Sequence, residues 1–332
     1  MTLSKKRIAL ILAFVSILII TILPNITHSS FYTYLSILIF INIIGAVSLN
    51  LIIKMGQVSI SHAAFMAIGG YLTAILATRT SLPFIVTFII TGIVAVIIGL
   101  LVGRVFLRLR GDYFILGTFA FGEFVTQVII NNKKYLGGAN GITGIPAPRM
   151  PFASLPFTEQ IQYYYLALIV MVIILVLVFM IYRSPVGRIL DSMKESEDLT
   201  QSLGINTVFY KVFIYAVGGG MVALGGSIFA YFMHYVSPFD FRFTEATGFI
   251  LMNVIGGRFS LLGPIIGAVL ITPLPEFFRQ FVQYQVFLYG AVVVLFVLYM
   301  PRGIVGLFER KRKKTTVSKI QAASITSGSN KQ

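Results

Sequence analysis

Apolar stretches long enough to cross a membrane recur along almost the whole chain, separated by short polar segments. They lie near residues 8–24, 32–53, 57–78, 84–107, 113–131, 161–182, 210–236, 245–257, 260–281 and 285–300. A helix of about 20 residues crosses the roughly 30 Å hydrocarbon core of a bilayer, and a helix satisfies its own backbone hydrogen bonds there. The alternating segments of about ten residues that indicate a membrane barrel are absent from the sequence. The pattern therefore predicts an all-α integral membrane protein with about ten transmembrane helices.

Composition and charge support the same class of protein. Of the 332 residues, 57% are hydrophobic and only 11% are charged, whereas a soluble domain carries about 25% charged residues. The net charge of +15 comes from Lys and Arg in short clusters between the apolar stretches. That distribution is typical of charge that fixes membrane orientation. We therefore expect the chain to lie in a lipid bilayer, and we exclude nucleic acid as a partner.

The basic clusters predict which loops face the cytoplasm. The Lys-Lys-Arg run at residues 5–7 places the N-terminus inside. No small-residue cleavage pattern follows residues 8–24, so we expect that stretch to remain as an uncleaved first span. With alternating spans, the later basic clusters fall on the same side: Lys54, 104–110, 183–211 and 310–314.

The polar segments divide the chain into one polytopic transmembrane domain, residues 1–308, and a tail, residues 309–332. The tail is basic and rich in Ser and Thr, and we expect it to be cytoplasmic and disordered. The Gly- and Pro-rich segment 132–160 is expected to be a structured extracytoplasmic loop rather than a domain. It contains Lys133 and Lys134, against the charge rule, but the rule weakens in long loops.

Two regions predict short or broken helices, near residues 56–70 and 245–265. The first is polar and Gly-rich, and the second combines a run of about 13 residues with a Gly-Pro pair at 263–264. Interrupted segments in corresponding places of two halves suggest an internal repeat. Two ordinary hairpin turns explain the same pattern equally well.

The sequence contains no catalytic constellation. There are three His and no Cys, and the few acids are separated by whole spans, so neither metal-ligand nor nucleophile spacing occurs. A P-loop is absent too. We therefore expect no enzymatic activity, no cofactor and no metal, with energy supplied by a partner or by an ion gradient.

Glu123 lies near the middle of the apolar run 113–131. A carboxylate at bilayer depth costs several kcal/mol unless it faces a cavity or a partner. A role in a translocation pathway or gate is therefore one interpretation. A packing residue hydrogen-bonded across helices is the other.

Gln57 and His62 precede a Gly-rich helix and are candidates for the same cavity. The alternative is that this region only starts the helix, with Ser59 or Ser61 as its cap.

The segment 183–211 is the largest predicted cytoplasmic insert. Leu190, Met193 and Leu199 have the spacing of an amphipathic helix, and Gly204 suits its left-handed C-terminal cap. Such a helix, projecting from the membrane, is what a permease needs to receive motion from an ATPase. A solvated connecting helix is the alternative that composition alone favours.

Several motifs occur in order along most of the chain. They are Leu49–Leu51, Gly56–Ser59, His62–Phe65, Gly69–Tyr71, Leu109–Phe114, Thr118, Ala120–Glu123, Gly137–Ile142, Ser184–Arg188, Leu203–Ile205, Gly256–Gly257, Leu262–Pro264, Tyr289–Gly290 and Pro301–Gly303. In these motifs the sequence resembles the branched-chain amino-acid ABC transporter permease family, specifically its LivM-like subunit, over roughly residues 35–308.

The resemblance implies a permease subunit in a bacterial cytoplasmic (inner) membrane, with both termini cytoplasmic. Such importers pair two homologous permease subunits with two ATP-hydrolysing cassette subunits and an extracytoplasmic solute-binding protein. We expect alternating access, with Leu, Ile and Val as the usual cargo of the family. Relatives carry other amino acids, amides or urea, so the exact solute stays open.

Together, the residue patterns and the resemblance lead to a mechanistic hypothesis with roles for individual residues. The expected pathway or gate residues are Gln57, His62, Thr118 and Glu123. The expected outer-loop residues are Gly137, Gly138, Asn140 and Gly141. The expected ATPase-coupling residues are Arg188, Glu195, Glu197, Leu203 and Gly204.

Two departures from the family pattern leave parts of this interpretation open. The usual alanine-rich core of the coupling segment is replaced at residues 197–202, and the usual small Gly-Ser turn after Gly257 is replaced by residues 258–260 (Arg-Phe-Ser). Two rival functions predict different behaviour. A secondary transporter would use Glu123 as ion carrier and would work alone, whereas a membrane scaffold or receptor would move no solute.

Overall fold

The computed structural model describes residues 29–109, 111–148, 157, 159–300 and 303–306. The predicted first span, 8–24, and the predicted tail, 309–332, lie outside the described residues.

Every apolar stretch predicted within the described residues coincides with helical structure. The helices in these stretches are α2 (Ser30–Lys54), α3 (His62–Arg79), α4 (Phe84–Phe106), α5 (Asp112–Asn131), α7 (Gln160–Arg183), α10 (Thr207–Met233), α11 (Phe243–Gly256), α12 (Leu262–Ile271), α13 (Leu274–Phe278), η3 (Arg279–Phe281) and α14 (Gln285–Tyr299). Among these residues, seven helical segments are long and apolar enough to cross a membrane, one of them running from α12 through η3. α3 is less apolar and α11 has only 14 residues. The all-α membrane class is supported, but the count of about ten is not confirmed.

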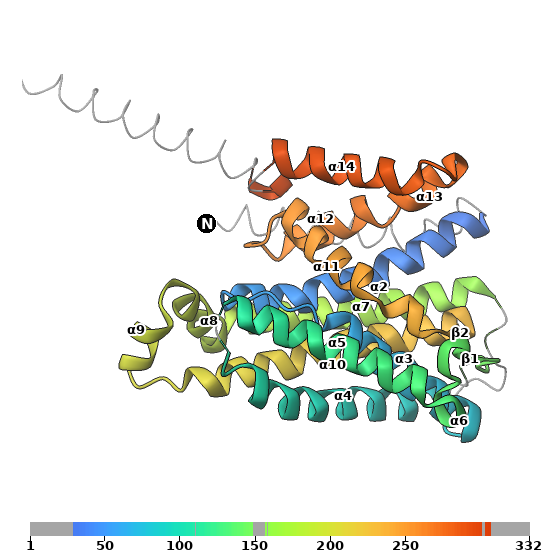
Figure 1. Cartoon of the computed structure of the whole chain (residues 1–332), viewed down its shortest axis with the longest axis horizontal. Coiled ribbons are helices and arrows are strands. Elements are labelled where there is room, and N and C mark those ends of the chain that lie inside the picture. Colours follow the sequence, from blue (N-terminus) through green and yellow to red (C-terminus); the bar gives the residue numbers. More distant parts are fainter. Residues whose placement is uncertain (1–28, 110, 149–156, 158, 301–302, 307–332) are drawn as a thin grey trace, which may run out of the picture.

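Helix α10 is the central element of the bundle and packs on α2, α3 and α4 (Figure 1). Small residues allow its backbone to approach its neighbours closely. A Cβ on Gly69 of α3 would lie 1.9 Å from the carbonyl oxygen of Ala223, and one on Gly99 of α4 would lie 2.7 Å from the Cα of Ala216. Membrane helices associate largely through such close van der Waals packing.

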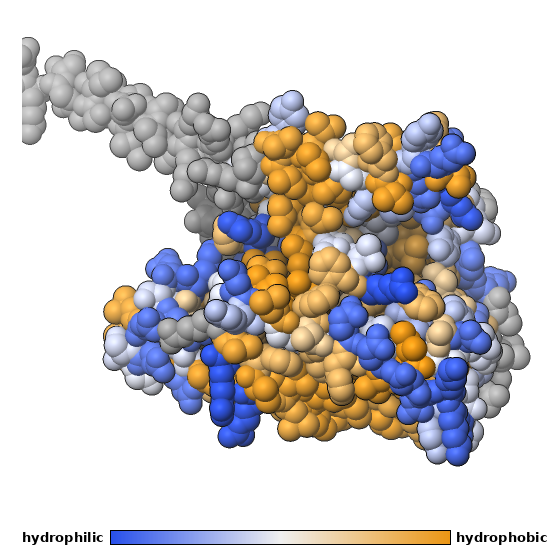
Figure 2. Space-filling model, in the orientation of Figure 1, coloured by the Kyte–Doolittle hydropathy of each residue, from blue (hydrophilic) through white to orange (hydrophobic). Residues whose placement is uncertain are grey.

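On the face shown in Figure 2, the middle of the bundle is mostly apolar and the two ends are mostly polar. α4 and α5 are mostly uncovered, since only 22% of the most apolar window of each is buried. An apolar belt between polar ends is the surface expected of a chain that lies in a bilayer.

The two predicted polar inserts lie at opposite ends of the bundle (Figure 1). Residues 183–211 form α8 (Pro185–Glu195) and α9 (Glu197–Ser202) at one end. At the other end, residues 132–148 form α6 (Lys133–Leu136), η1 (Gly138–Asn140) and β1 (Ile142–Thr143). β1 pairs antiparallel with β2 (Tyr235–Val236), which is followed by η2 (Pro238–Phe241).

Both regions predicted to be interrupted contain non-helical backbone. α2 ends at Lys54, and α3 begins only at His62, five residues later than the predicted start of that span. In the second region α11 ends at Gly256, and α12 runs for only 10 residues from Leu262. The second interruption is a tight turn between two closely packed helices, because a Cβ on Gly256 would lie 1.7 Å from the carbonyl oxygen of Gly263.

Candidate functional site

Helix α8 begins at a local capping signal and buries one face. Pro185 occupies its first turn, and the Ser184 hydroxyl accepts a hydrogen bond from the Gly187 backbone. Leu190 and Met193 point inward and are buried, as the amphipathic spacing predicts. The prediction for Leu199 is wrong, because the helix breaks at Ser196 and Leu199 lies exposed on α9.

Helix α9 is fixed to α10 by a buried ion pair. Lys211 Nζ lies 2.6 Å from Glu197 Oε1, and the lysine is 2% exposed. Thr207 Oγ1 donates a second hydrogen bond to the same carboxylate oxygen, at 3.4 Å. A lysine buried this deeply requires a partner. Glu197 therefore points into the protein, unlike the other expected coupling residues.

Helix α8 is joined to α2 by a second charge pair. Lys54 Nζ lies 2.5 Å from Asp191 Oδ1 and 4.5 Å from the centre of the Tyr182 ring. The carboxylate is largely exposed, so the pair contributes little to stability by itself. It does set the position of α8 against the end of α2.

Two buried asparagines, Asn50 of α2 and Asn253 of α11, connect this end of α2 and α7 to α11. The Tyr182 hydroxyl donates to Asn50 Oδ1, and Asn50 Nδ2 donates to Asn253 Oδ1 at 2.7 Å. Asn253 Nδ2 in turn donates to the carbonyl oxygens of Ala46 and Phe249. Both asparagines are fully buried. Contacts from α8 thus reach α11 through α2 and α7.

Helix α8 also touches the turn between α11 and α12. Lys194 Nζ lies 3.5 Å from the centre of the Phe259 ring, and the Arg258 guanidinium lies 4.7 Å from the same ring. This turn is the one whose Arg-Phe-Ser sequence departs from the family pattern. The Phe259 ring of this turn forms a cation–π contact with Lys194 of α8.

The remaining expected coupling residues form the free surface of α8 and α9. Arg188, Glu195 and Gly204 are exposed, and Leu203 is 72% exposed. Gly204 has φ +82°, which confirms the left-handed conformation predicted for it. This surface combines charges with two unpartnered leucines, Leu199 and Leu203.

Several polar groups of the non-helical segment between α2 and α3 are hydrogen-bonded to neighbouring helices. The Ile60 backbone N–H donates to Thr118 Oγ1 on α5, and the Ser61 hydroxyl bonds to the Tyr215 hydroxyl on α10 at 2.7 Å. Ser59 accepts from the Ser61 backbone, so neither serine hydroxyl caps α3. Irregular backbone inside a membrane protein requires such internal partners.

The structure separates the four residues expected to line one cavity. His62 is buried between α2 and α10, beside Gly218 and the carbonyl group of Ser48. Gln57 is half-buried. It follows Gly56, where a Cβ would lie 3.2 Å from the Cα of Lys194 in α8. Thr118 is fully buried on α5 and bonded to the segment before α3.

Glu123 is exposed on α5, where it lines a narrow cleft. The opposite walls are the start of α3, at Ala63 and Ala64, and the segment joining η2 to α11, at Arg242 and Phe243. His62 and Gln57 do not line this cleft. Glu123 and Thr118 therefore share the α3–α5 region, whereas His62 points toward α2 and α10.

The outer-loop residues form a compact turn that depends on glycine. Gly137, Gly138 and Gly141 have φ of +75°, +63° and +71°. A Cβ on Gly141 would lie 2.0 Å from the carbonyl oxygen of Val236 in β2. The Asn140 side chain is exposed at the tip.

The comparison with known proteins decides the family. Residues 31–298 match the family described as branched-chain amino acid transport system / permease component. The chain belongs to this family.

Three relatives agree with that assignment. The chain is 28% identical, over 286 residues, to the high-affinity branched-chain amino acid transport system permease protein LivM of Salmonella typhimurium, covering 80% of this chain and 67% of that protein. The LivM protein of Escherichia coli K12 is 29% identical with the same coverage. The probable LivM permease of Methanocaldococcus jannaschii is 22% identical over 213 residues, covering 60% and 61%. No solved structure matches the chain significantly.

Sequence reasoning missed the interactions that hold α8 and α9 and connect them to the rest of the bundle. Asn50 and Asn253 each lie inside a predicted apolar stretch, and Lys211 lies at the start of another. Polar residues in such positions are a usable signal, since they require partners inside the membrane. Pairing them with one another, however, needs the tertiary structure.

Proposed function

We propose that the chain is a permease subunit of an ATP-driven importer for branched-chain amino acids, working by alternating access. The observation that carries the proposal is the attachment of α8 and α9. The buried Lys211–Glu197 pair fixes α9 to the central helix α10, and α8 contacts α2 through the more exposed Lys54–Asp191 pair. Force applied to this segment would therefore act on the core of the bundle.

The ATP-hydrolysing partners are proposed to bind the free surface of α8 and α9. The exposed Leu199 and Leu203 offer an apolar contact between charged residues such as Arg188 and Glu195. Solvent-exposed apolar anchors within a polar rim are typical of protein interfaces. The energy for transport then comes from these partners.

The end carrying α8 is proposed to face the cytoplasm. Its helix ends and loops hold Lys54, Arg104, Arg108, Arg183 and Arg188, in agreement with the positive-inside rule. The opposite end, with η1 and the β1–β2 ladder, would then receive the solute-binding protein. Both termini would be cytoplasmic, in a bacterial inner membrane.

The second permease subunit is proposed to cover α5. This helix exposes the apolar side chains of Tyr113, Leu116 and Phe124 together with the polar Glu123 and Gln127. A carboxylate and an amide on one face are costly toward lipid, and they favour a protein or aqueous neighbour. The solute pathway would lie at this interface, with Thr118 and Glu123 beside it.

Gln57 and His62 are proposed to act at the inner end of the pathway. Gln57 comes directly after Gly56, which lies close to Lys194 of α8. The Oε1 atom of Gln57 has no hydrogen-bond partner within the described residues. His62 starts α3 and is packed against α10 at Gly218. A shift of α8 would displace the segment between them, which is the gating step that alternating access requires.

The cargo is proposed to be Leu, Ile and Val, because the two LivM relatives are named for branched-chain amino acid transport. Substrate choice can also reside in the binding protein, so another small solute is the alternative outcome.

Site-directed cross-linking tests the docking surface. The chain has no Cys, so Leu203→Cys introduces a unique thiol for a photoactivatable maleimide in the assembled importer. We expect a cross-link to the ATPase subunit from Leu203→Cys and none from Asn140→Cys at the other end. A cross-link from Asn140→Cys alone would overturn the proposed orientation, and none from either would overturn the docking surface.

A further inference from the structure

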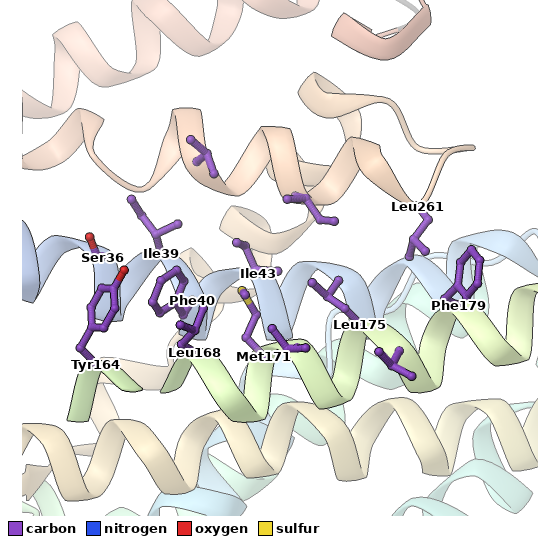
Figure 3. A pocket seen from close by; sticks show the side chains of 14 residues that line it. Ser36, Ile39, Phe40, Ile43, Tyr164, Leu168, Met171, Leu175, Phe179 and Leu261 are labelled. Atoms are coloured by element: carbon purple, nitrogen blue, oxygen red, sulfur yellow. The ribbon is translucent and has the colours of Figure 1, made fainter. Parts of the chain in front are cut away.

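A long apolar groove runs along the outside of the bundle, between α2, α7 and α12. It has a volume of about 580 Å³ and is lined almost entirely by apolar side chains, including Ile39, Leu168, Val172, Ile265 and Val269. Tyr164 and Ser36 lie at one end of the groove, and Phe179 and Leu261 lie at the other (Figure 3). From Tyr164 to Phe179, helix α7 rises about 22 Å at about 1.5 Å per residue. The groove therefore extends over about two thirds of the roughly 30 Å hydrocarbon core.

We propose that the N-terminal apolar segment of this chain, residues 8–24, occupies the groove. As a helix it would be about 25 Å long, which matches the groove. It is followed by residues 25–29 and then by α2, which begins at Ser30. A connection this short reaches about 20 Å at most, so the segment must lie antiparallel to α2 and beside it.

The burial of α2 restricts where that neighbour can lie. From Ile44 to Ile53 every residue of α2 is buried and none lines the groove, so the inner half of this helix has no free face. A helix running antiparallel to α2 can contact only its outer half and must then continue along α7 and α12. Ser36, Ile39, Phe40 and Ile43 are the α2 positions that line the groove, and Ser36 and Ile39 are half-buried.

The segment has a face suited to close packing. Ala9, Ala13 and Ser16 fall on one side of a helix, with the larger Ile11, Val15 and Leu18 on the other. Small residues spaced in this way let membrane helices approach closely. With the small face toward the groove, Ala9 would lie at the level of Ile265 and Ala13 at the level of Val269. The Lys-Lys-Arg run at residues 5–7 would then lie at the α8 end, with Lys54 and Arg183.

Disulfide and bismaleimide cross-linking tests this packing directly, because the native chain has no Cys. The double variants Ala13→Cys/Val269→Cys and Ala9→Cys/Ile265→Cys would be made in the full chain, assembled with its partners in membranes. We expect most of the chain to give the intramolecular cross-linked peptide, identified by mass spectrometry after proteolysis.

Two matched controls test which face of the segment packs in the groove and which helices it contacts. Val15→Cys/Val269→Cys places the thiol on the opposite side of the segment, and Ala13→Cys/Ile93→Cys uses an exposed residue of α4. Both should lose most of the cross-link. The proposal is overturned by cross-linking to Ile93, or by no cross-link in either test pair. Products of twice the chain mass would show that a second copy covers the groove and would overturn it as well. The readout is independent of transport, so its failure is distinguishable from failure of the proposed function.

Discussion

Lys211 Nζ lies 2.6 Å from Glu197 Oε1, in a pair that joins the first turns of the central helix α10 to the short helix α9. The lysine is almost completely buried, whereas the carboxylate is 23% exposed. Breaking a buried pair by removing one charge costs about 3–5 kcal/mol, because the other charge is left uncompensated. The pair is therefore a structural anchor of the proposed coupling segment.

Glu197→Gln should lower the thermal unfolding temperature of the assembled importer and reduce ATPase stimulation by loaded binding protein. The double variant Glu197→Gln/Lys211→Met should recover much of the stability, because no buried charge remains. Glu195→Gln, two residues away and exposed, is the control for stability only, because Glu195 belongs to the proposed ATPase-binding surface, and it should unfold at the native temperature. An equal fall in the unfolding temperature of Glu197→Gln and Glu195→Gln would contradict the anchor.

The Asn50–Asn253 pair gives a second prediction. Asn253→Leu removes one of the two acceptors of the Asn50 amide, the other being the Arg258 carbonyl oxygen, at a cost of about 1–3 kcal/mol. Because this pair connects α11 to the helices that hold α8, we expect less uptake per ATP hydrolysed as well as lower stability. Asn42→Leu is the matched control. Asn42 lies on α2, like Asn50, and bonds to Thr272 at the end of α12, away from α8. A similar loss of coupling in both variants would count against a specific link.

Glu123 gives a prediction about the pathway. Glu123→Gln keeps the size of the side chain and removes its charge at the cleft between α3, α5 and α11. We expect slower uptake with unchanged assembly and thermal stability, measured in proteoliposomes. Gln127→Asn, one turn further along the same exposed face, should have little effect. Native uptake by Glu123→Gln would remove this residue from the pathway.

The outer loop gives a test with a built-in comparison. Gly141 and Gly144 have nearly the same φ, +71° and +70°, but only a Cβ at Gly141 would meet another backbone. Gly144→Ala therefore carries only the left-handed penalty, about 1–2 kcal/mol. Gly141→Ala must also displace Val236. We expect Gly141→Ala to weaken stimulation by the binding protein more than Gly144→Ala, in an ATPase assay. Equal effects would show that the β1–β2 contact is irrelevant there.

Local pattern in the sequence was enough to predict the helices. Each predicted apolar stretch within the described residues coincides with helical structure, and Gly204 has the backbone conformation expected of a helix cap. Boundaries were less accurate where polar residues enter the bundle. The span predicted from residue 57 begins at His62, because the preceding backbone bonds to Thr118 rather than continuing as a helix.

The site was predictable only in part, because its contacts join residues far apart in the chain. Glu197 was expected to meet a partner protein, yet it pairs with Lys211. His62 and Glu123 were expected in one cavity, but they point to different helices. Phe259 lies in the turn that departs from the family pattern, and its ring contacts Lys194 of α8. None of these pairings leaves a local signal in the sequence.

Uptake of labelled leucine tests the central proposal most directly. Proteoliposomes would contain this chain, its partner permease and ATPase subunits, and loaded binding protein. A parallel preparation would carry an ATPase whose P-loop Lys is replaced. We predict ATP-dependent leucine uptake that is lost with the inactive ATPase and is unaffected by collapsing ion gradients. Uptake that persists with the inactive ATPase and disappears with the gradient would contradict an ATP-driven importer.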